Sequence, residues 1–144
     1  MQIESPAFVH QQFIPQEYTC QGADISPPLI FRDVPKEAIS LVLIVDDPDA
    51  PGRIFVHWLA WNIPADAHHL PSGERPSKQG KNDFGTLRYG GPCPPPGKPH
   101  RYFFKLYAID TLLNLANGAS KKELESALDG HVVDQAELIG LFQR

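Results

Sequence analysis

The sequence is poor in cysteine, in clustered basic residues and in long apolar runs, and each shortage excludes a class of protein. Only Cys20 and Cys93 occur among 144 residues, and their wide separation fits no metal-ligand or redox spacing. The 13 basic and 17 acidic residues give a net charge of -4 without a block of Lys or Arg, which disfavours binding to nucleic-acid phosphates or an anionic membrane surface. No apolar stretch approaches the roughly 20 residues that span a bilayer.

These shortages lead to expectations about location and organisation. The N-terminal segment Met1-Gln-Ile-Glu-Ser-Pro contains neither a basic region nor an apolar run, so no targeting segment is indicated. We therefore expect a cytoplasmic protein, and because disulfides are rare in that compartment we expect Cys20 and Cys93 to be free thiols. The length and the 42% hydrophobic content fit a single domain over residues 1–144.

The abundant turn-forming residues, 15 prolines and 11 glycines, favour short strands and long loops over helices. Apolar or alternating runs predict three strong strands at residues 39–45, 54–63 and 100–110. The N-terminal third predicts further short strands. Residues 65–91 are polar and punctuated by Pro and Gly, which predicts a surface loop with one short strand at most.

Only the C-terminal part has the pattern of a helix. Ser120 and Glu123 form a capping box, and the apolar stripe that follows it stops at Gly130. A second short helix is predicted from Val132. The fold class is therefore mainly β with short C-terminal helices.

Three polar features lie where predicted strands meet loops. Asp47 and Asp49 occupy a turn that Pro48 and Pro51 stiffen, although carboxylates in such turns often do no more than cap backbone amides. His57 lies in an otherwise apolar strand, and His100 begins a strand after the Pro-rich loop. Each of these histidines alone is compatible with a purely structural role.

Together the three features favour a site for a small anion, because a rigid scaffold can present such side chains at the ends of strands. A carboxylate would orient one imidazole, while histidine N–H groups and free backbone amides beside Gly91 and Cys93 would hold an oxyanion. Four aromatic residues on the strands are expected in the core rather than in the site; they are Trp58, Trp61, Phe103 and Phe104. The exposed His68-His69 pair is assigned no role.

Three sequence blocks, in this order and at this spacing, resemble the signatures of a known family. The blocks are Asp46-Asp47-Pro48-Asp49-Ala50-Pro51, Val56-His57-Trp58-Leu59-Ala60-Trp61-Asn62-Ile63-Pro64, and Tyr89-Gly90-Gly91-Pro92-Cys93-Pro94-Pro95 followed by His100-Arg101-Tyr102. They are similar to those of the phosphatidylethanolamine-binding protein family. The match extends outward to Ser26-Pro27-Pro28 and Gly130-His131-Val132, and it most resembles the compact bacterial and archaeal branch, often called Raf kinase inhibitor-like.

The resemblance implies a Greek-key sandwich of two antiparallel sheets, with a pocket for phosphate, phosphorylethanolamine or a similar anion at one end. The pocket positions that it assigns to this chain are Asp47, Pro48, His57, Cys93, Pro94, Pro95, His100 and Tyr102. Where some relatives have Gly in the Pro-rich loop this chain has Cys93, which would narrow the pocket or offer a thiol. Longer eukaryotic members close the pocket with a C-terminal helix, and we expect none here, which leaves the headgroup preference open.

The leading functional hypothesis is a regulatory binding module that needs no turnover, cofactor or metal. The alternative is inhibition of a serine protease or a kinase through the loop at residues 65–85. A third hypothesis, a metal held by two histidines and a carboxylate, would make the protein an enzyme, but the common catalytic motifs are missing. The expected partners are a small anion, a protease or kinase, and a second copy of the chain, since the resemblance implies a homodimer.

Overall fold

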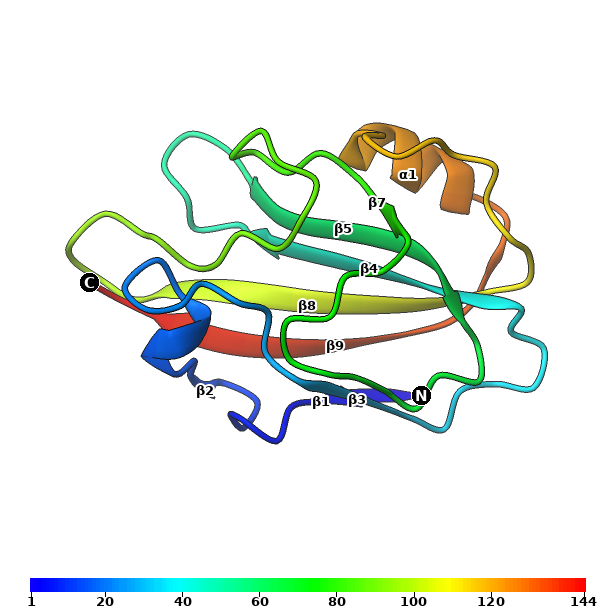
Figure 1. Cartoon of the computed structure of the whole chain (residues 1–144), viewed down its shortest axis with the longest axis horizontal. Helices are drawn as coiled ribbons and strands as arrows, with labels where there is room; N and C mark the ends of the chain where they lie inside the picture. Colours follow the sequence, from blue (N-terminus) through cyan, green and yellow to red (C-terminus); the bar gives the residue numbers. More distant parts are fainter.

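The computed structural model describes all 144 residues and contains two β-sheets, one α-helix and one 3-10 helix (Figure 1). The strands are β1 (Gln2–Glu4), β2 (Gln12–Phe13), β3 (Leu29–Arg32), β4 (Ser40–Asp47), β5 (Phe55–Pro64), β6 (His69–Leu70), β7 (Lys78–Gln79), β8 (His100–Ile109) and β9 (Val132–Phe142). The helices are η1 (Gln16–Tyr18) and α1 (Lys121–Leu128). The larger sheet has the order β2-β9-β8-β4-β5-β7 and the smaller sheet has the order β1-β3-β6.

Strand β4 lies in the middle of the larger sheet and is buried on both faces. Leu41, Leu43 and Val45 belong to the main core, which also contains side chains of the smaller sheet. The alternate residues Val42 and Ile44 belong to a second core beneath helix α1. Because successive side chains of a strand point to opposite faces, a strand covered on both sides appears in the sequence as an unbroken apolar run, here residues 41–45.

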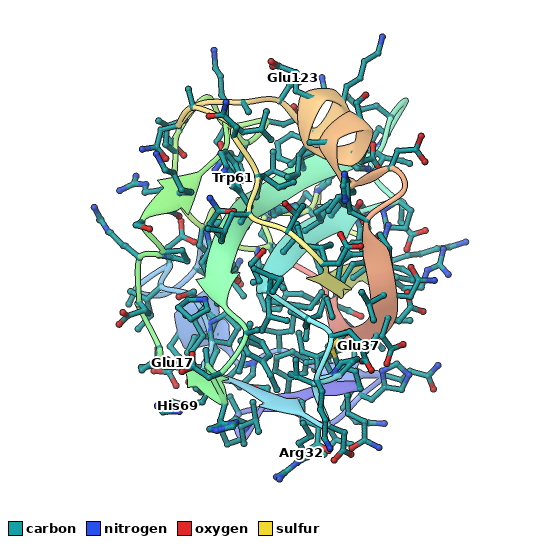
Figure 2. All side chains as sticks on the ribbon, turned by 90° about the vertical axis from the view of Figure 1, so that its right-hand side faces the viewer. Glu17, Arg32, Glu37, Trp61, His69 and Glu123 are labelled. Atoms are coloured by element: carbon teal, nitrogen blue, oxygen red, sulfur yellow. A yellow bond between two sulfur atoms is a disulfide. The ribbon has the colours of Figure 1, made fainter.

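Helix α1 covers the face of the larger sheet opposite the smaller sheet. Its start is the predicted capping box, in which Ser120 Oγ accepts from the Glu123 amide at 3.1 Å and Glu123 Oε1 accepts from the Ser120 amide at 3.0 Å. Leu124 and Leu128 are its buried residues. Figure 2 shows the helix over one face of the sheet, with Trp61 in the layer between them.

The antiparallel register brings the ends of three neighbouring strands together at one end of the larger sheet. Asp47 at the end of β4 pairs with Phe55 at the start of β5. On the other side of β4, Asp46 pairs with Phe103 near the start of β8. The end of β4 and the beginnings of β5 and β8 therefore meet, and they carry the polar residues that the sequence had marked.

The structure confirms the prediction of a mainly β, two-sheet architecture with three strong strands. The prediction of a second C-terminal helix is wrong. The segment from Val132 is instead the 11-residue strand β9, paired antiparallel with β8 along nearly its whole length. Its buried positions Leu138, Gly140 and Phe142 alternate, which is the period of a strand. Residues 65–91 form mostly loop, with two two-residue strands, β6 and β7, rather than one at most.

Three of the four aromatic residues predicted in the core are buried there, namely Trp58, Trp61 and Phe104. Phe103 is only half-buried, because it lies on the outer face of β8 between the cations of Arg101 and Lys105. No helix of the protein is long and apolar enough to cross a membrane.

Candidate ligand-binding site

A pocket of about 260 Å³ opens at the edge where β4, β5 and β8 meet, and the Pro-rich loop forms its far wall. Seven of the eight predicted site residues line it: Asp47, His57, Cys93, Pro94, Pro95, His100 and Tyr102. Pro48 is not among the residues that line the pocket. The turn that contains Pro48 contributes Ala50 and Pro51 to the wall in its place.

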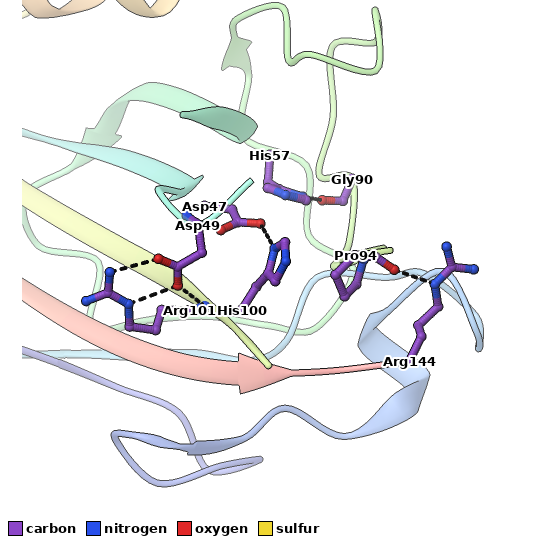
Figure 3. Close-up of polar contacts among 8 residues, drawn as sticks. All are labelled: Asp47, Asp49, His57, Gly90, Pro94, His100, Arg101 and Arg144. Carbon is purple, nitrogen blue, oxygen red and sulfur yellow. Dashed lines mark hydrogen bonds and ion pairs between the residues drawn. The ribbon is translucent and has the colours of Figure 1, made fainter. Parts of the chain in front are cut away.

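His57 is anchored by the backbone of the Pro-rich loop (Figure 3). Its Nδ1 lies 2.7 Å from the carbonyl oxygen of Gly90, and the Gly90 amide donates to the His57 carbonyl at 3.0 Å. The side chain is almost fully buried, and this burial lowers the pKa of His57 against the opposing effects of the Gly90 carbonyl and nearby carboxylates. The ring is therefore neutral at neutral pH, with its Nδ1–H donating to Gly90.

His100 is held by a carboxylate. Its Nδ1 lies 2.7 Å from Asp47 Oδ2, and both side chains are largely buried. The other oxygen of Asp47 accepts from the Asp49 amide at 2.8 Å. Asp49 in turn accepts from the backbone amide and the guanidinium of Arg101 at 2.9 Å, and the hydrogen bond from Arg101 holds the pKa of Asp49 below its usual value.

Both interpretations of the acidic turn therefore apply. Asp47 caps a turn amide and also orients His100, whereas Asp49 fastens the turn to the start of β8 and does not line the pocket. A carboxylate that fixes the Nδ1–H of an imidazole sets its orientation. The ring of His100 is thus presented to the pocket in one position.

The hydroxyl of Tyr102 is buried in the pocket wall, where the carboxylate of Asp47 acts on it. Burial raises the pKa of Tyr102 well above its usual value, and the nearby carboxylate of Asp47 adds to the effect. The group is therefore a neutral O–H.

Two phenylalanines of the pocket were not predicted from the sequence. Phe55 and Phe84 both line it, and their rings lie 5.0 and 5.4 Å from that of His57. Phe55 directly follows the start of the predicted strand and could have been found from its spacing to His57. Phe84 comes from the polar loop at residues 65–91, where no local pattern connects it to the pocket.

The two cysteines form a disulfide, so the prediction of free thiols is wrong. Cys20 and Cys93 are joined across a separation of 73 residues, with their Cα atoms 5.4 Å apart. Cys20 follows helix η1, while Cys93 lies in the Pro-rich loop and lines the pocket. The bond ties the pocket wall to the N-terminal segment, and neither cysteine offers a thiol to a ligand.

Free backbone amides were predicted beside Gly91 and Cys93, but the amide of Gly91 is not free. The Gly91 amide donates to Asp24 Oδ1 at 2.7 Å, and the Pro92 carbonyl accepts from the Cys20 amide at 3.1 Å. On the far side of the loop, Arg144 Nε donates to the Pro94 carbonyl at 2.6 Å. These contacts hold the wall rigidly, but they remove the Gly91 amide from the groups that could bind an oxyanion.

No group of three or more His, Cys, Asp and Glu side chains is arranged to hold a metal ion. Among the polar side chains that line the pocket, His57 and His100 each keep one ring nitrogen, Nε2, without a hydrogen bond inside the protein, and Tyr102 adds a buried hydroxyl. For the imidazoles, Nδ1 is occupied in both cases.

Comparison with known proteins assigns this arrangement to a family. The model of a family described as phosphatidylethanolamine-binding protein matches residues 4–143. The chain belongs to the phosphatidylethanolamine-binding protein family. It is 51% identical to a UPF0098 protein of Methanothermobacter thermautotrophicus, over 100% of this chain and 99% of that one. Its identity to a UPF0098 protein of Pyrococcus horikoshii is also 51%, over 97% and 75% of the two chains.

Solved structures of family members agree with the fold. A putative phosphatidylethanolamine-binding protein homolog from Chlamydia trachomatis superposes with a TM-score of 0.95 at 43% identity, over 99% of this chain and 97% of the other. YbcL of Escherichia coli, described as a new member of the mammalian family, gives a TM-score of 0.93 at 31% identity, over 99% and 98%. The predicted resemblance to the bacterial and archaeal branch of the family is confirmed.

The neutral, buried His57 predicts how the stability of this family member depends on pH. Because the folded state lowers the pKa of His57, the unfolded chain binds a proton more readily. The free energy of unfolding is therefore expected to fall as the pH drops below about 6.5, the ordinary value for histidine. Urea unfolding at pH 7.5 and pH 5 measures the loss, and a His57→Gln variant should lose less over this interval. An equal loss in the variant would contradict the prediction.

Proposed function

We propose that this protein is a binding module for a small oxyanion, either free phosphate or a phosphate-bearing headgroup such as phosphorylethanolamine, and that it acts in regulation rather than catalysis. The observation that carries the proposal is a 260 Å³ pocket lined by His57 and His100, both held through Nδ1, and by the neutral hydroxyl of Tyr102. A hydroxyl can donate to an oxyanion without any change of protonation.

The two imidazoles support the same ligand. Both are fixed through Nδ1, so that Nε2 is the only ring nitrogen left for a ligand. The pocket is also small, and its rim is apolar, with Phe55, Phe84 and two prolines of the Pro-rich loop. A tetrahedral anion with a short substituent suits such a site better than a large polar molecule does.

The test is a calorimetric titration of inorganic phosphate and phosphorylethanolamine into the wild type and a His57→Ala, His100→Ala double variant. A lost hydrogen bond to a charged group is worth about 1.5–3 kcal/mol, so the double variant is expected to bind inorganic phosphate at least about tenfold more weakly. A His68→Ala, His69→Ala variant is the matched control, since it removes two imidazoles that do not line the pocket.

Equal binding by the wild type and the folded double variant would refute the proposed site. If the wild type bound neither ligand, the alternative of a protease or kinase inhibitor acting through residues 65–85 would become the leading proposal. Formation of a homodimer remains a separate prediction, which sedimentation of the purified protein tests.

A further inference from the structure

The two ring nitrogens that face the ligand are acceptors whenever their imidazoles are neutral. A carbonyl oxygen can only accept, so the 2.7 Å contact to Gly90 requires the proton of neutral His57 to be on Nδ1. The carboxylate of Asp47 imposes the same tautomer on neutral His100. In both rings Nε2 then carries a lone pair, which repels a fully deprotonated oxyanion rather than binding it.

No cation in the pocket offsets this arrangement. Neither Lys nor Arg lines it. Arg101 forms its hydrogen bonds to Asp49, and Arg144 donates to the Pro94 carbonyl. An anion that enters therefore contacts no Lys or Arg of the lining, and the nearest cation whose charge reaches the pocket wall is Arg144, which acts on Tyr102 from outside the lining. The protons of the anion itself then decide how many hydrogen bonds it can form with the imidazoles.

Of the two rings, His57 depends more on a hydrogen-bond donor from the ligand. It is 3% exposed and has a carbonyl rather than a carboxylate on Nδ1, whereas His100 contacts Asp47 directly. The charged groups whose fields reach its ring are carboxylates. They are Asp46 and Asp47 of β4 and Asp24 of the N-terminal segment. From β8, the neutral hydroxyl of Tyr102 and the ring of His100 share the pocket with it.

The geometry points to a pocket that selects oxyanions carrying a proton of their own, with His57 Nε2 as the acceptor of that proton and therefore the residue that determines specificity. This inference rests on the proposed anion-binding function and narrows its ligand class. Inorganic phosphate retains a P–O–H group throughout the neutral range and satisfies the acceptor. Sulfate has no proton to donate near neutral pH, and a phosphate monoester loses its last one with a pKa of about 6.

The test compares inorganic phosphate, sulfate and phosphorylethanolamine on the wild-type protein by calorimetry between pH 6 and 8. At pH 7.5 phosphate is expected to bind at least about tenfold more tightly than sulfate, because sulfate leaves the buried acceptor unsatisfied. The affinity for phosphorylethanolamine should fall by up to tenfold per pH unit as its phosphate loses the last proton, while its ammonium group stays charged, and the affinity for phosphate should fall much less. Because both ligands meet the same protein groups, the difference between the slopes isolates the proton on the phosphate of the ligand.

A His57→Gln variant provides the second readout, because its amide can donate where the neutral imidazole only accepts. We expect the preference for phosphate over sulfate to shrink in this variant. Equal affinity of the wild type for phosphate and sulfate would overturn the inference and leave the anion site in place. A full preference retained in His57→Gln would also overturn it. If the wild type bound none of the three anions, the proposed function itself would fail.

Discussion

A Cys20→Ala, Cys93→Ala double variant is expected to lose about 2–5 kcal/mol of the free energy of unfolding, because the disulfide closes a long loop in the unfolded chain. The two residues are 73 positions apart, so the reduced chain gains much conformational freedom on unfolding. In the folded state the bond ties the Pro-rich wall of the pocket to the segment after η1. Urea unfolding of the oxidised wild type and of the variant measures the difference.

Two controls separate the effect of the disulfide on stability from the effect of removing the two side chains. The wild type unfolded in the presence of a dithiol reductant should resemble the double variant, and Cys20→Ala alone should lose as much as the pair. Cys20 is exposed, so its truncation removes little packing. An oxidised wild type that unfolds at the same urea concentration as the double variant would show that the bond does not stabilise this fold.

A Gly91→Ala substitution is expected to destabilise the protein by about 3 kcal/mol, the upper range for overpacking, and to weaken phosphate binding. A Cβ atom at this position would overlap with the Tyr18 carbonyl oxygen and with the Asp24 carboxylate, and it would lie 2.9 Å from the Thr19 Cα. Backbone atoms cannot rotate away as a side chain can. The Pro-rich wall must therefore move, and the Gly90 carbonyl that anchors His57 lies directly beside it.

The adjacent glycine is the matched control for this prediction. A Cβ atom on residue 90 would meet mainly the ring of Phe84, which is 47% exposed and can turn into solvent. Gly90→Ala is therefore expected to lose only about 1 kcal/mol. Thermal unfolding of both variants makes the comparison of stability. Equal losses of stability would mean that the backbone of the N-terminal segment yields to a Cβ atom as easily as the ring of Phe84 does.

The largest error in the sequence reasoning concerned the cysteines, and it came from an argument about compartment rather than about geometry. A cytoplasmic location was expected, and free thiols were inferred from it. The disulfide contradicts the prediction of free thiols, so the state of the cysteines gives no support to a cytoplasmic location. The cytoplasmic location therefore stays a prediction.

The second error concerned the C-terminal strand. Val132 and Val133 follow shortly after the capped helix, which ends at Leu128, and the sequence predicts a second short helix there. In the structure β9 covers the free edge of β8, which otherwise would expose its unpaired backbone groups. Pairing along a neighbouring strand is a tertiary contact that no local pattern in this segment reports.

The roles assigned to individual atoms also changed once the fold was known. Histidine N–H groups and a free Gly91 amide were expected as donors to the anion. Instead the Nδ1–H of His57 is used by Gly90, and the Gly91 amide is used by Asp24. Contacts between distant segments decide which donors and acceptors are already used inside the protein. Residue types at a given spacing therefore identify a site, but they do not specify which of its atoms remain free for a ligand.

The sequence by itself determined the elements whose information is local. Runs of apolar residues marked the central strands, the pair Ser120 and Glu123 marked the start of α1, and the family blocks marked seven of the residues that line the pocket. Only the tertiary structure decided the pairing of Cys20 with Cys93, the placement of Phe84, and the tautomers of the two imidazoles. The physical reason is that these features depend on atoms brought together across tens of residues, where closing the chain and satisfying buried polar groups outweigh any local preference.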